Sequence, residues 1–417
     1  MKNENIEKII ELIISFTKKL PSPAKEMVGD ELDNIKELLM DNRPPRILVL
    51  GRRGAGKSSI INALFKANIA KVGSVTSETG KAQWHSFSND TGSIEILDTR
   101  GLGDKTRPES ANFEEALDDI KAEIQHICPD IILFMCKAKE VDAHISADLR
   151  NVYEMKQFIL NKHQYEIPIA ALVTQVDELD PIRIEPPYEN TKKKANIAKA
   201  VLALKNAYRD SNIDLMETIP VSAYAEFENG EIVYEKFWNI DKLVEYLIDH
   251  LPKSAQLQLA RLTRLRKLQV KLARTTIGST ATVCAGLAAV PLPLADIIPI
   301  TSAQIGMIMG IGYIGGRKLS KKSAKDFFAA MGMNVGAGFA LREIARAAIK
   351  YVFPGAGSAV SAGIAFAATW GIGEAAIAYF IDKKSIDEAK EAMKKAKKKH
   401  KSEGEQVEKQ IAVRSGS

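Results

Sequence analysis

A phosphate-binding loop is the first feature of this sequence that could do chemistry. An apolar run, residues 46–50, leads directly into Gly51-Arg52-Arg53-Gly54-Ala55-Gly56-Lys57-Ser58, which has the spacing GxxxxGK[S/T] between a strand pattern and a helix pattern. Glycines let the backbone fold around a phosphate with its N–H groups pointing inward, and the helix N-terminus adds a favourable dipole. We therefore expect Lys57 to contact the β- and γ-phosphates of a nucleotide and the Ser58 hydroxyl to bind Mg²⁺.

Two later segments predict how the γ-phosphate and the metal ion are held. The apolar strand pattern 94–97 ends in Asp98-Thr99-Arg100-Gly101, which places Asp98 to hold Mg²⁺ through water and the Gly101 amide to meet the γ-phosphate. The polar loop 73–79 should supply a threonine that contacts Mg²⁺ and senses the γ-phosphate. For this role we favour Thr76 over Thr79. The alternative is that this loop is an ordinary solvated connection.

Two further motifs favour guanine over adenine. The strand pattern 167–173 ends in Thr174-Gln175-Val176-Asp177, which resembles the [N/T]KxD motif of GTPases. The aspartate of that motif accepts hydrogen bonds from guanine N1 and N2, which adenine cannot supply, and an unpaired buried carboxylate rejects the wrong base. The segment Ser222-Ala223-Tyr224 resembles the loop whose backbone amide reads guanine O6. All the motifs occur in order at the carboxyl ends of predicted strands, where α/β sheets bind ligands.

The predicted nucleotide site therefore draws on the whole region between residues 51 and 224. The residues expected to contact the nucleotide are Gly51, Gly54, Ala55, Gly56, Lys57, Ser58, Ser59, Thr174, Gln175, Asp177, Ser222, Ala223 and Tyr224. Those expected to hold Mg²⁺ are Ser58, Thr76 and Asp98, and those expected to act in hydrolysis are Lys57, Thr76, Gly101 and Arg53.

Alternating strand and helix patterns must position these residues. We predict strands at 46–50, 83–88, 93–97, 130–136, 167–173 and 215–221, the pattern of an α/β domain with a mostly parallel sheet. The pair Asn229-Gly230 predicts a small hairpin before the last helix. The expected fold class is α/β: a Ras-like P-loop domain with a mixed, mostly parallel sheet, an all-α C-terminal domain and short N-terminal helices.

Composition divides the chain into four regions. We predict N-terminal helices over 1–43, a GTPase domain over 44–251, a helical domain over 252–385 and a Lys-rich tail over 386–417 that frays. Only three cysteines occur, at no metal-ligand or redox spacing, and the N-terminus lacks the features of a secretory signal. These features indicate a cytoplasmic protein.

The motifs together resemble the TrmE–Era–EngA–YihA–septin group of GTPases, particularly the Era-like branch with its interferon-inducible-type relatives. This resemblance covers about residues 45–250. Residues 255–385, centred on Pro291-Leu292-Pro293-Leu294-Ala295-Asp296, look like the YcjF-related helical domain that often follows such GTPases. The resemblance implies a Mg²⁺-dependent GTPase that binds GTP and GDP, a possible homodimer through the GTPase domain, and N-terminal helices that pack against the helical lobe.

Two positions depart from the family pattern. Gln175 stands where lysine is usual, so it keeps the aliphatic stem that packs on guanine but loses the charge; we expect guanine selectivity with weaker affinity. Leu102 stands where Ras-like enzymes carry the glutamine that orients the attacking water, so hydrolysis must be slow or must borrow another group. Arg52 and Arg53 are candidates for an arginine finger, with Arg100 as a third; the alternative is a solvated basic edge of the loop.

The segment 275–316 carries a single charge, Asp296, and allows three interpretations. It could form a membrane-inserted hairpin broken at Pro291 and Pro293, a soluble bundle of Ala/Gly-rich helices, or amphipathic helices that lie on a membrane surface. The preceding segment 253–274 carries seven Lys or Arg and no acid, which could serve lipid headgroups, RNA or a solvated helix face. Because aromatic residues are few and no RNA-binding signature accompanies it, we favour lipid over RNA.

The sequence thus predicts a GTP-binding switch protein that hydrolyses GTP to GDP and phosphate. GTP with Mg²⁺ would order the loop around Thr76 and the segment 99–113, and this change would act on the helical domain, on a dimer partner, or at the cytoplasmic face of a membrane. Two alternatives remain: a nucleotide-gated scaffold with negligible hydrolysis, and a ribosome- or RNA-associated Era-like GTPase.

Overall fold

The structure is a computed structural model and describes most of the chain in two compact units. The described residues are 4–18, 20, 22–52, 54–68, 82–89, 92–98, 113–141, 145–210, 217–288, 298–318, 320–331 and 361–415. One unit is Pro44–Thr263, and the other joins Met1–Arg43 to Arg264–Ser417.

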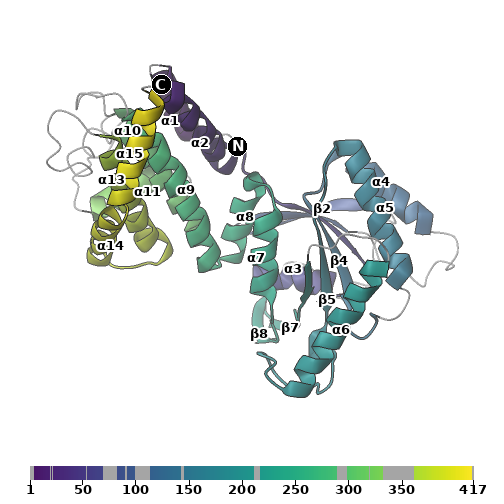
Figure 1. Ribbon diagram of the computed structural model, residues 1–417. Helices are drawn as coiled ribbons and strands as arrows, with labels where there is room; N and C mark the ends of the chain where they lie inside the picture. The colour runs from purple at the N-terminus through teal and green to yellow at the C-terminus, as the bar shows by residue number, and fades with distance from the viewer. Residues whose placement is uncertain are drawn as a thin grey trace. The chain divides into compact units, whose positions relative to one another are not determined.

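A six-stranded sheet forms the centre of the unit Pro44–Thr263 (Figure 1). The strand order is β2-β3-β1-β4-β5-β6, with β2 antiparallel to β3 and all other neighbours parallel. The strands are β1 (Arg46–Gly51), β2 (Gln83–Ser88), β3 (Ser93–Asp98), β4 (Ile131–Lys137), β5 (Ile169–Thr174) and β6 (Glu217–Pro220). Each lies within two residues of its predicted bounds, and the predicted α/β class with a mostly parallel sheet is confirmed.

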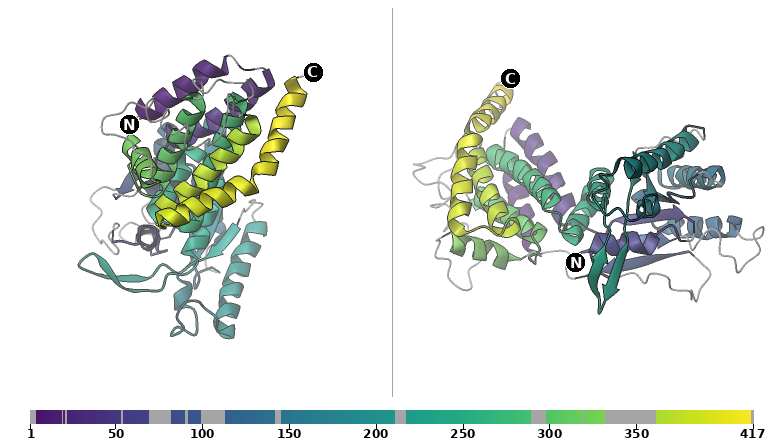
Figure 2. Two further views of the ribbon diagram at one scale, coloured as in Figure 1. Left: turned by 90° about the vertical axis from the view of Figure 1, so that its left-hand side faces the viewer. Right: turned by 90° about the horizontal axis from the view of Figure 1, so that it is seen from below.

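Helices cover both faces of this sheet, which explains why its central strands are continuous apolar runs. Helices α4, α5 and α6 lie on one face and α3, α7 and α8 on the other (Figures 1 and 2). Their bounds are α3 (Lys57–Phe65), α4 (Phe113–His126), α5 (Ile145–His163), α6 (Thr191–Asp210), α7 (Ile240–His250) and α8 (Lys253–Thr263). The predicted hairpin is also confirmed: β7 (Ala225–Glu228) and β8 (Glu231–Glu235) flank Asn229 and Gly230, whose φ angles of 51° and 85° suit a tight turn.

The second unit is entirely helical among its described residues. Helix α2 packs along α9, α1 packs on α10, and α13 packs against α9, α14 and α15. The bounds are α1 (Glu4–Thr17), α2 (Ser22–Leu39), α9 (Arg266–Leu287), α10 (Ile298–Ile314), α11 (Lys321–Ala330), α13 (Ala362–Ala376), α14 (Ile386–Lys399) and α15 (Lys401–Ser415). The N-terminal helices therefore pack against the C-terminal helical lobe, as the family resemblance implied.

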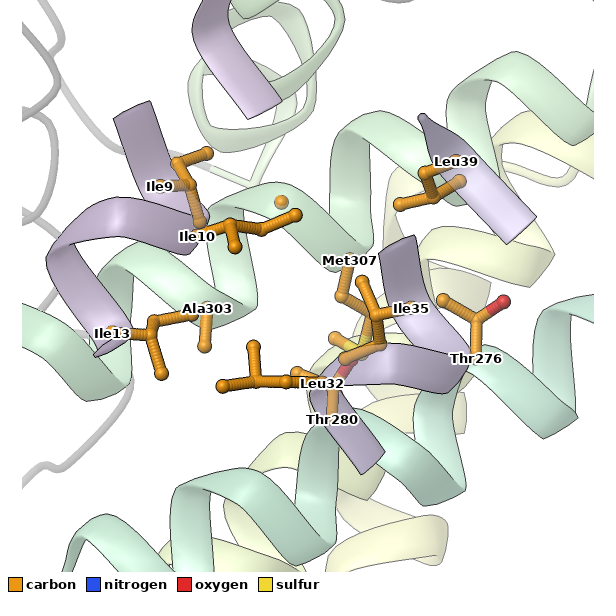
Figure 3. Close-up of a pocket in the computed structure, with 11 residues that line it drawn as sticks. Ile9, Ile10, Ile13, Leu32, Ile35, Leu39, Thr276, Thr280, Ala303 and Met307 are labelled. Atoms are coloured by element: carbon orange, nitrogen blue, oxygen red, sulfur yellow. The ribbon is translucent and has the colours of Figure 1, made fainter. Parts of the chain in front are cut away.

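The join between the N-terminal helices and the lobe is apolar. Isoleucines of α1 and residues of α2 face α9 and α10 around a small cavity (Figure 3). Its lining consists of Ile9, Ile10, Ile13, Leu32, Ile35, Leu39, Thr276, Thr280, Ala303, Gly306 and Met307. Ile9, Ile10 and Ile13 of α1 are buried where this helix packs on α10.

The described parts of the apolar segment 275–316 lie mainly in α9 and α10, and most of their side chains are buried inside the helical unit. Ile277, Ile300 and Ile308 are fully buried. Among the described helices, one stretch, Ala362–Ile381, is long and apolar enough to cross a membrane, and 72% of its most apolar window is buried within the protein. A buried core helix has the same composition, so length and hydropathy do not distinguish the two.

Two of the predicted boundaries differ from the structure. Helix α8, predicted to begin the helical domain, belongs to the unit with the sheet. A Cβ atom added at Gly92 would lie 2.7 Å from the Gln258 carbonyl oxygen, so the β2–β3 connection and α8 are in backbone contact. The prediction of a fraying tail is wrong for residues 386–415, which form α14 and α15; a capping box of Ser385 and Glu388 begins α14, and Ala389 and Ala396 are buried.

Candidate nucleotide-binding site

The predicted phosphate loop lies between β1 and α3, as the motif requires. Gly54 and Gly56 have φ angles of 78° and 90°, a left-handed conformation that favours glycine. Gly51 is required for another reason, because a Cβ atom there would lie 2.6 Å from the Met135 carbonyl oxygen of β4. Lys57 is the first residue of α3, and its Nζ donates to the Gly51 carbonyl at 3.3 Å, so its side chain folds back over the loop.

The other predicted phosphate-loop residues continue this arrangement. Ala55 is buried, and its amide donates to the Arg52 carbonyl at 3.1 Å, which closes the turn. Ser58 and Ser59 lie in the first turn of α3 and are half-buried. Backbone N–H groups in the first turn of a helix have no partner within that helix, so this end of α3 can accept an anion. A glycine-lined turn before such a helix fits a nucleotide phosphate.

The predicted base-reading residues lie at the carboxyl end of β5, beside the phosphate loop. Gln175 has a φ of 57°, and its Nε2 donates to the Gly54 carbonyl at 2.7 Å. Thr174 is buried, and its hydroxyl donates to the Cys136 carbonyl of β4 at 3.3 Å. The side-chain amide of Gln175, a neutral donor, thus links the base-reading loop to the phosphate loop.

The Asp177 carboxylate is tied to the third predicted loop. Its Oδ1 accepts a hydrogen bond from the Ser222 hydroxyl at 2.9 Å. Ser222 is itself fixed by two backbone hydrogen bonds with Trp238, of 3.2 and 3.0 Å. Ser222, Ala223 and Tyr224 follow the end of β6, and the Tyr224 hydroxyl donates to Glu226 of the hairpin at 2.5 Å. The structure therefore brings the predicted residues of three separate loops together at one edge of the sheet.

The remaining predicted residues are only partly covered by the described chain. Asp98 is the last residue of β3 and pairs with Val49 of β1, which places its backbone at the same sheet edge. Arg53, Thr76, Arg100, Gly101 and Leu102 lie outside the described residues. Among the residues that the structure does describe, no three His, Cys, Asp or Glu side chains form a metal-binding group. Ser58, in the first turn of α3, is the predicted Mg²⁺ ligand whose side chain the structure describes.

An ion pair beside the phosphate loop was not predicted. Arg52 donates through Nε and Nη2 to the two carboxylate oxygens of Asp148, at 2.9 and 3.3 Å. Asp148 lies in the first turn of α5 and is 8% exposed, and its hydrogen bond raises the pKa of Arg52. The guanidinium is therefore held by a partner within its own unit. The two residues are 96 positions apart, and no local sequence signal links them.

This strand order, with a phosphate loop between β1 and the next helix, defines a Ras-like P-loop GTPase domain joined to a helical region. Comparison with known families agrees with this class. Residues 46–171 match the model of the family described as 50S ribosome-binding GTPase. The match runs from β1 into β5.

Curated relatives are similar over short parts of the chain. The ribosome biogenesis GTPase A of Bacillus licheniformis is 35% identical over 79 residues, which are 19% of this chain and 27% of the relative. The tRNA modification GTPase MnmE of Ureaplasma parvum is 27% identical over 158 residues, 36% of each chain. The chain thus spans between about a quarter and a little over a third of the length of these relatives.

Two solved structures are similar to parts of this chain at low sequence identity. Era in complex with MgGDPNP and a segment of 16S ribosomal RNA is 21% identical, covering 51% of this chain and 58% of Era, with a TM-score of 0.32. Toc33 from Arabidopsis thaliana, in complex with GDP and Mg²⁺, is 17% identical over 59% of this chain and 95% of Toc33, with a TM-score of 0.34.

Proposed function

We propose that this protein is a GTP-binding switch that hydrolyses GTP to GDP and phosphate. The observation that carries the proposal is the link between the two halves of the site: Gln175 Nε2 lies 2.7 Å from the Gly54 carbonyl, so the base-reading loop and the phosphate loop form one site. The Asp177 carboxylate, oriented by Ser222, accepts hydrogen bonds only, which complements the N1–H and N2–H₂ donors of guanine.

The chain's own groups supply the phosphate end of this site. The amides of the phosphate loop and the first turn of α3 bind phosphate oxygens, and Lys57 adds a positive charge. Ser58, Asp98 and Thr76 would hold Mg²⁺, which neutralises charge on the phosphates when it is bound. Because the three glycines and Lys57 are arranged as a phosphate cradle, the residues present fit this ligand.

Hydrolysis should be slow without a partner. Leu102 cannot orient a water molecule, so another group must stabilise the charge that develops on the transferred phosphoryl. Because Arg52 is engaged by Asp148, Arg53 and Arg100 remain the candidates for an arginine finger, in cis or across a homodimer. This proposal favours activation by dimerisation or by a partner over fast intrinsic turnover.

Binding at a membrane surface is the proposed output of the switch. The parts of the apolar segment 275–316 that form α9 and α10 are mostly buried in the helical unit, whereas α14 exposes lysines that include Lys395, Lys398 and Lys399. Exposed lysines are attracted to anionic lipid headgroups by roughly 1 kcal/mol each. These features support peripheral association at the cytoplasmic face of a membrane rather than an inserted hairpin.

Ribosome association is a second candidate, favoured by the comparisons with known proteins. The family model that matches residues 46–171 is described as 50S ribosome-binding GTPase, and one relative is named for ribosome biogenesis. In this case the switch would act on a ribosomal particle, and co-sedimentation with 50S subunits in the presence of a non-hydrolysable GTP analogue would reveal it.

Calorimetric titration with GDP, IDP and ADP tests the proposed nucleotide class. We expect GDP to bind more tightly than IDP, which lacks the N2 amino group, and ADP to bind least. Asp177→Ala should lose at least tenfold in GDP affinity, since a charged hydrogen bond contributes about 1.5–3 kcal/mol. Asp180→Ala, an exposed residue three positions away, is the matched control and should bind GDP normally. Equal affinity for GDP and ADP would exclude a guanine site.

Phosphate release tests the hydrolysis. Specific activity that rises with protein concentration would support dimer activation, and Arg53→Ala should lower turnover while GDP affinity stays the same. No release of phosphate at any protein concentration, with GTP bound normally, would favour the nucleotide-gated scaffold.

A further inference from the structure

One lysine is fully buried beneath the base-reading loop. Lys193 lies in the first turn of α6 and has no exposed surface, although its neighbours Lys192 and Lys194 are exposed. A charged amine is costly to bury unless hydrogen-bond acceptors surround it. Burial lowers the pKa of Lys193. Such a residue calls for an explanation other than stability.

The acceptors of Lys193 belong to the segment that carries the predicted guanine-reading carboxylate. Its Nζ donates to the backbone carbonyl of Asp177 at 2.7 Å and to that of Leu179 at 2.5 Å. The first of these carbonyls lies within a single helical turn, Val176–Glu178, and the second follows it directly; a turn this short does not fix its own direction. Two charge-assisted hydrogen bonds from a rigid helix therefore determine where this turn lies.

An aromatic contact continues from Lys193 to the other side of the site. The ammonium lies 4.9 Å from the centre of the Tyr188 ring, and that ring lies edge-on to Trp238 at 5.1 Å. Trp238 is the residue whose backbone pairs with Ser222, and Ser222 donates to the Asp177 carboxylate. The contacts thus form a closed circuit around Asp177. Lys193 holds its main chain, and Ser222 holds its side chain.

We propose that Lys193 is a positioning residue for base recognition: by fixing the backbone of residues 177–179, it keeps the Asp177 carboxylate directed at the two guanine donors and so sets the preference for guanine over hypoxanthine. This inference rests on the proposed guanine-nucleotide function. Lys193 does not touch the base itself, because its ammonium is occupied by main-chain carbonyls on the buried side of the turn. Without Lys193, the turn loses the two hydrogen bonds that hold the carbonyls of Asp177 and Leu179.

The ratio of GDP affinity to IDP affinity is the readout that separates positioning from general stability. IDP lacks the N2 amino group, so the ratio measures how well the carboxylate meets that donor. We expect the unmodified protein to prefer GDP over IDP by roughly tenfold or more. Lys193→Met fills the same space without donors, so the ratio of GDP affinity to IDP affinity should fall to a value between about 1 and 3. Lys193→Gln, with one neutral donor, should give an intermediate ratio.

Lys194→Met is the matched control. Lys194 is the next residue of α6, is exposed, and pairs with Glu189 at the surface, so its loss should leave the ratio unchanged. Circular dichroism melts of each variant show whether it is folded; if Lys193→Met does not fold, Lys193→Gln carries the test. An unchanged ratio in a folded Lys193 variant, or an equal loss of GDP and IDP affinity, would overturn the inference. If the unmodified protein binds GDP, IDP and ADP alike, the proposed function itself fails instead.

Discussion

At the scale of single residues, Gln175 shows how a departure from a motif can be partly compensated. The sequence predicts guanine selectivity with weaker affinity, because glutamine lacks the charge of the usual lysine. The structure shows that the side chain still reaches the phosphate loop, where Nε2 donates to the Gly54 carbonyl at 2.7 Å. What is lost is the charge on that donor, and a neutral hydrogen bond contributes about 1 kcal/mol less than a charged one.

Gln175→Lys should therefore tighten nucleotide binding. We expect GDP to bind roughly fivefold more tightly, since about 1 kcal/mol corresponds to that factor. Gln175→Ala removes the tie to Gly54 and should weaken binding by a similar factor. Titration with a fluorescent GDP analogue measures all three proteins under one condition. If lysine, glutamine and alanine at position 175 gave the same affinity, the tie between the two loops would have no role in binding.

Other residues of the site could not be predicted because their contacts are made in three dimensions only. The motif glycines, Lys57 and Asp177 are read from local spacing, and the structure places them together. Asp148 and Lys193 are not, since Asp148 contacts Arg52 across 96 positions and Lys193 reaches Asp177 from a different element. In the sequence, Lys193 is one of three consecutive lysines, and nothing distinguishes the buried one from its exposed neighbours.

At the scale of elements, the apolar pattern of the sequence predicted the strands well. It predicted less well which domain the C-terminal helices belong to. Central strands such as β4 and β5 are buried on both faces, so their apolar runs are unmistakable. The hairpin followed from Asn229-Gly230. Helix α8 was assigned to the wrong side of the boundary because its basic composition resembles that of the following helix. Helices α14 and α15 were predicted to be a tail because lysines dominate their composition. The few small apolar residues that they bury, such as Ala389 and Ala396, do not form a clear pattern in the sequence.

Gly92→Ala tests whether α8 belongs with the sheet. The added methyl group would lie 2.7 Å from the Gln258 carbonyl oxygen and 3.1 Å from Leu262 Cβ, so α8 must shift. We expect the free energy of unfolding to fall by about 1–3 kcal/mol, as for other overpacked sites, measured by urea denaturation. Gly29→Ala in α2, where nothing lies within 4 Å, is the control and should be neutral or stabilising by up to about 1 kcal/mol. Equal stability of the two variants would mean that α8 is not held against the β2–β3 connection.

At the scale of the whole molecule, the question is where the charge and the apolar surface of the helical unit lie. The apolar residues of α9 and α10 face neighbouring helices. Two arginines of the basic segment 253–274 are paired within the unit, Arg266 with Asp382 and Arg274 with Glu374. Helix α14 adds exposed lysines, among them Lys395, Lys398 and Lys399. A membrane would therefore meet lysines, and the interaction should be electrostatic.

Flotation with vesicles separates this surface association from insertion. With the full chain and vesicles rich in phosphatidylserine, we expect flotation at low salt that is lost at about 1 M salt, where the Debye length is about 3 Å. Replacing Lys395, Lys398 and Lys399 of α14 with glutamate should abolish it. Replacing three lysines of α6 with glutamate is the control and should leave flotation intact. These lysines, Lys192, Lys199 and Lys205, are also exposed. A GDP arm and a non-hydrolysable GTP arm show whether the nucleotide governs the association. Flotation that resists both salt and the α14 reversal would contradict surface binding and would return the segment 275–316 to the role of a membrane hairpin.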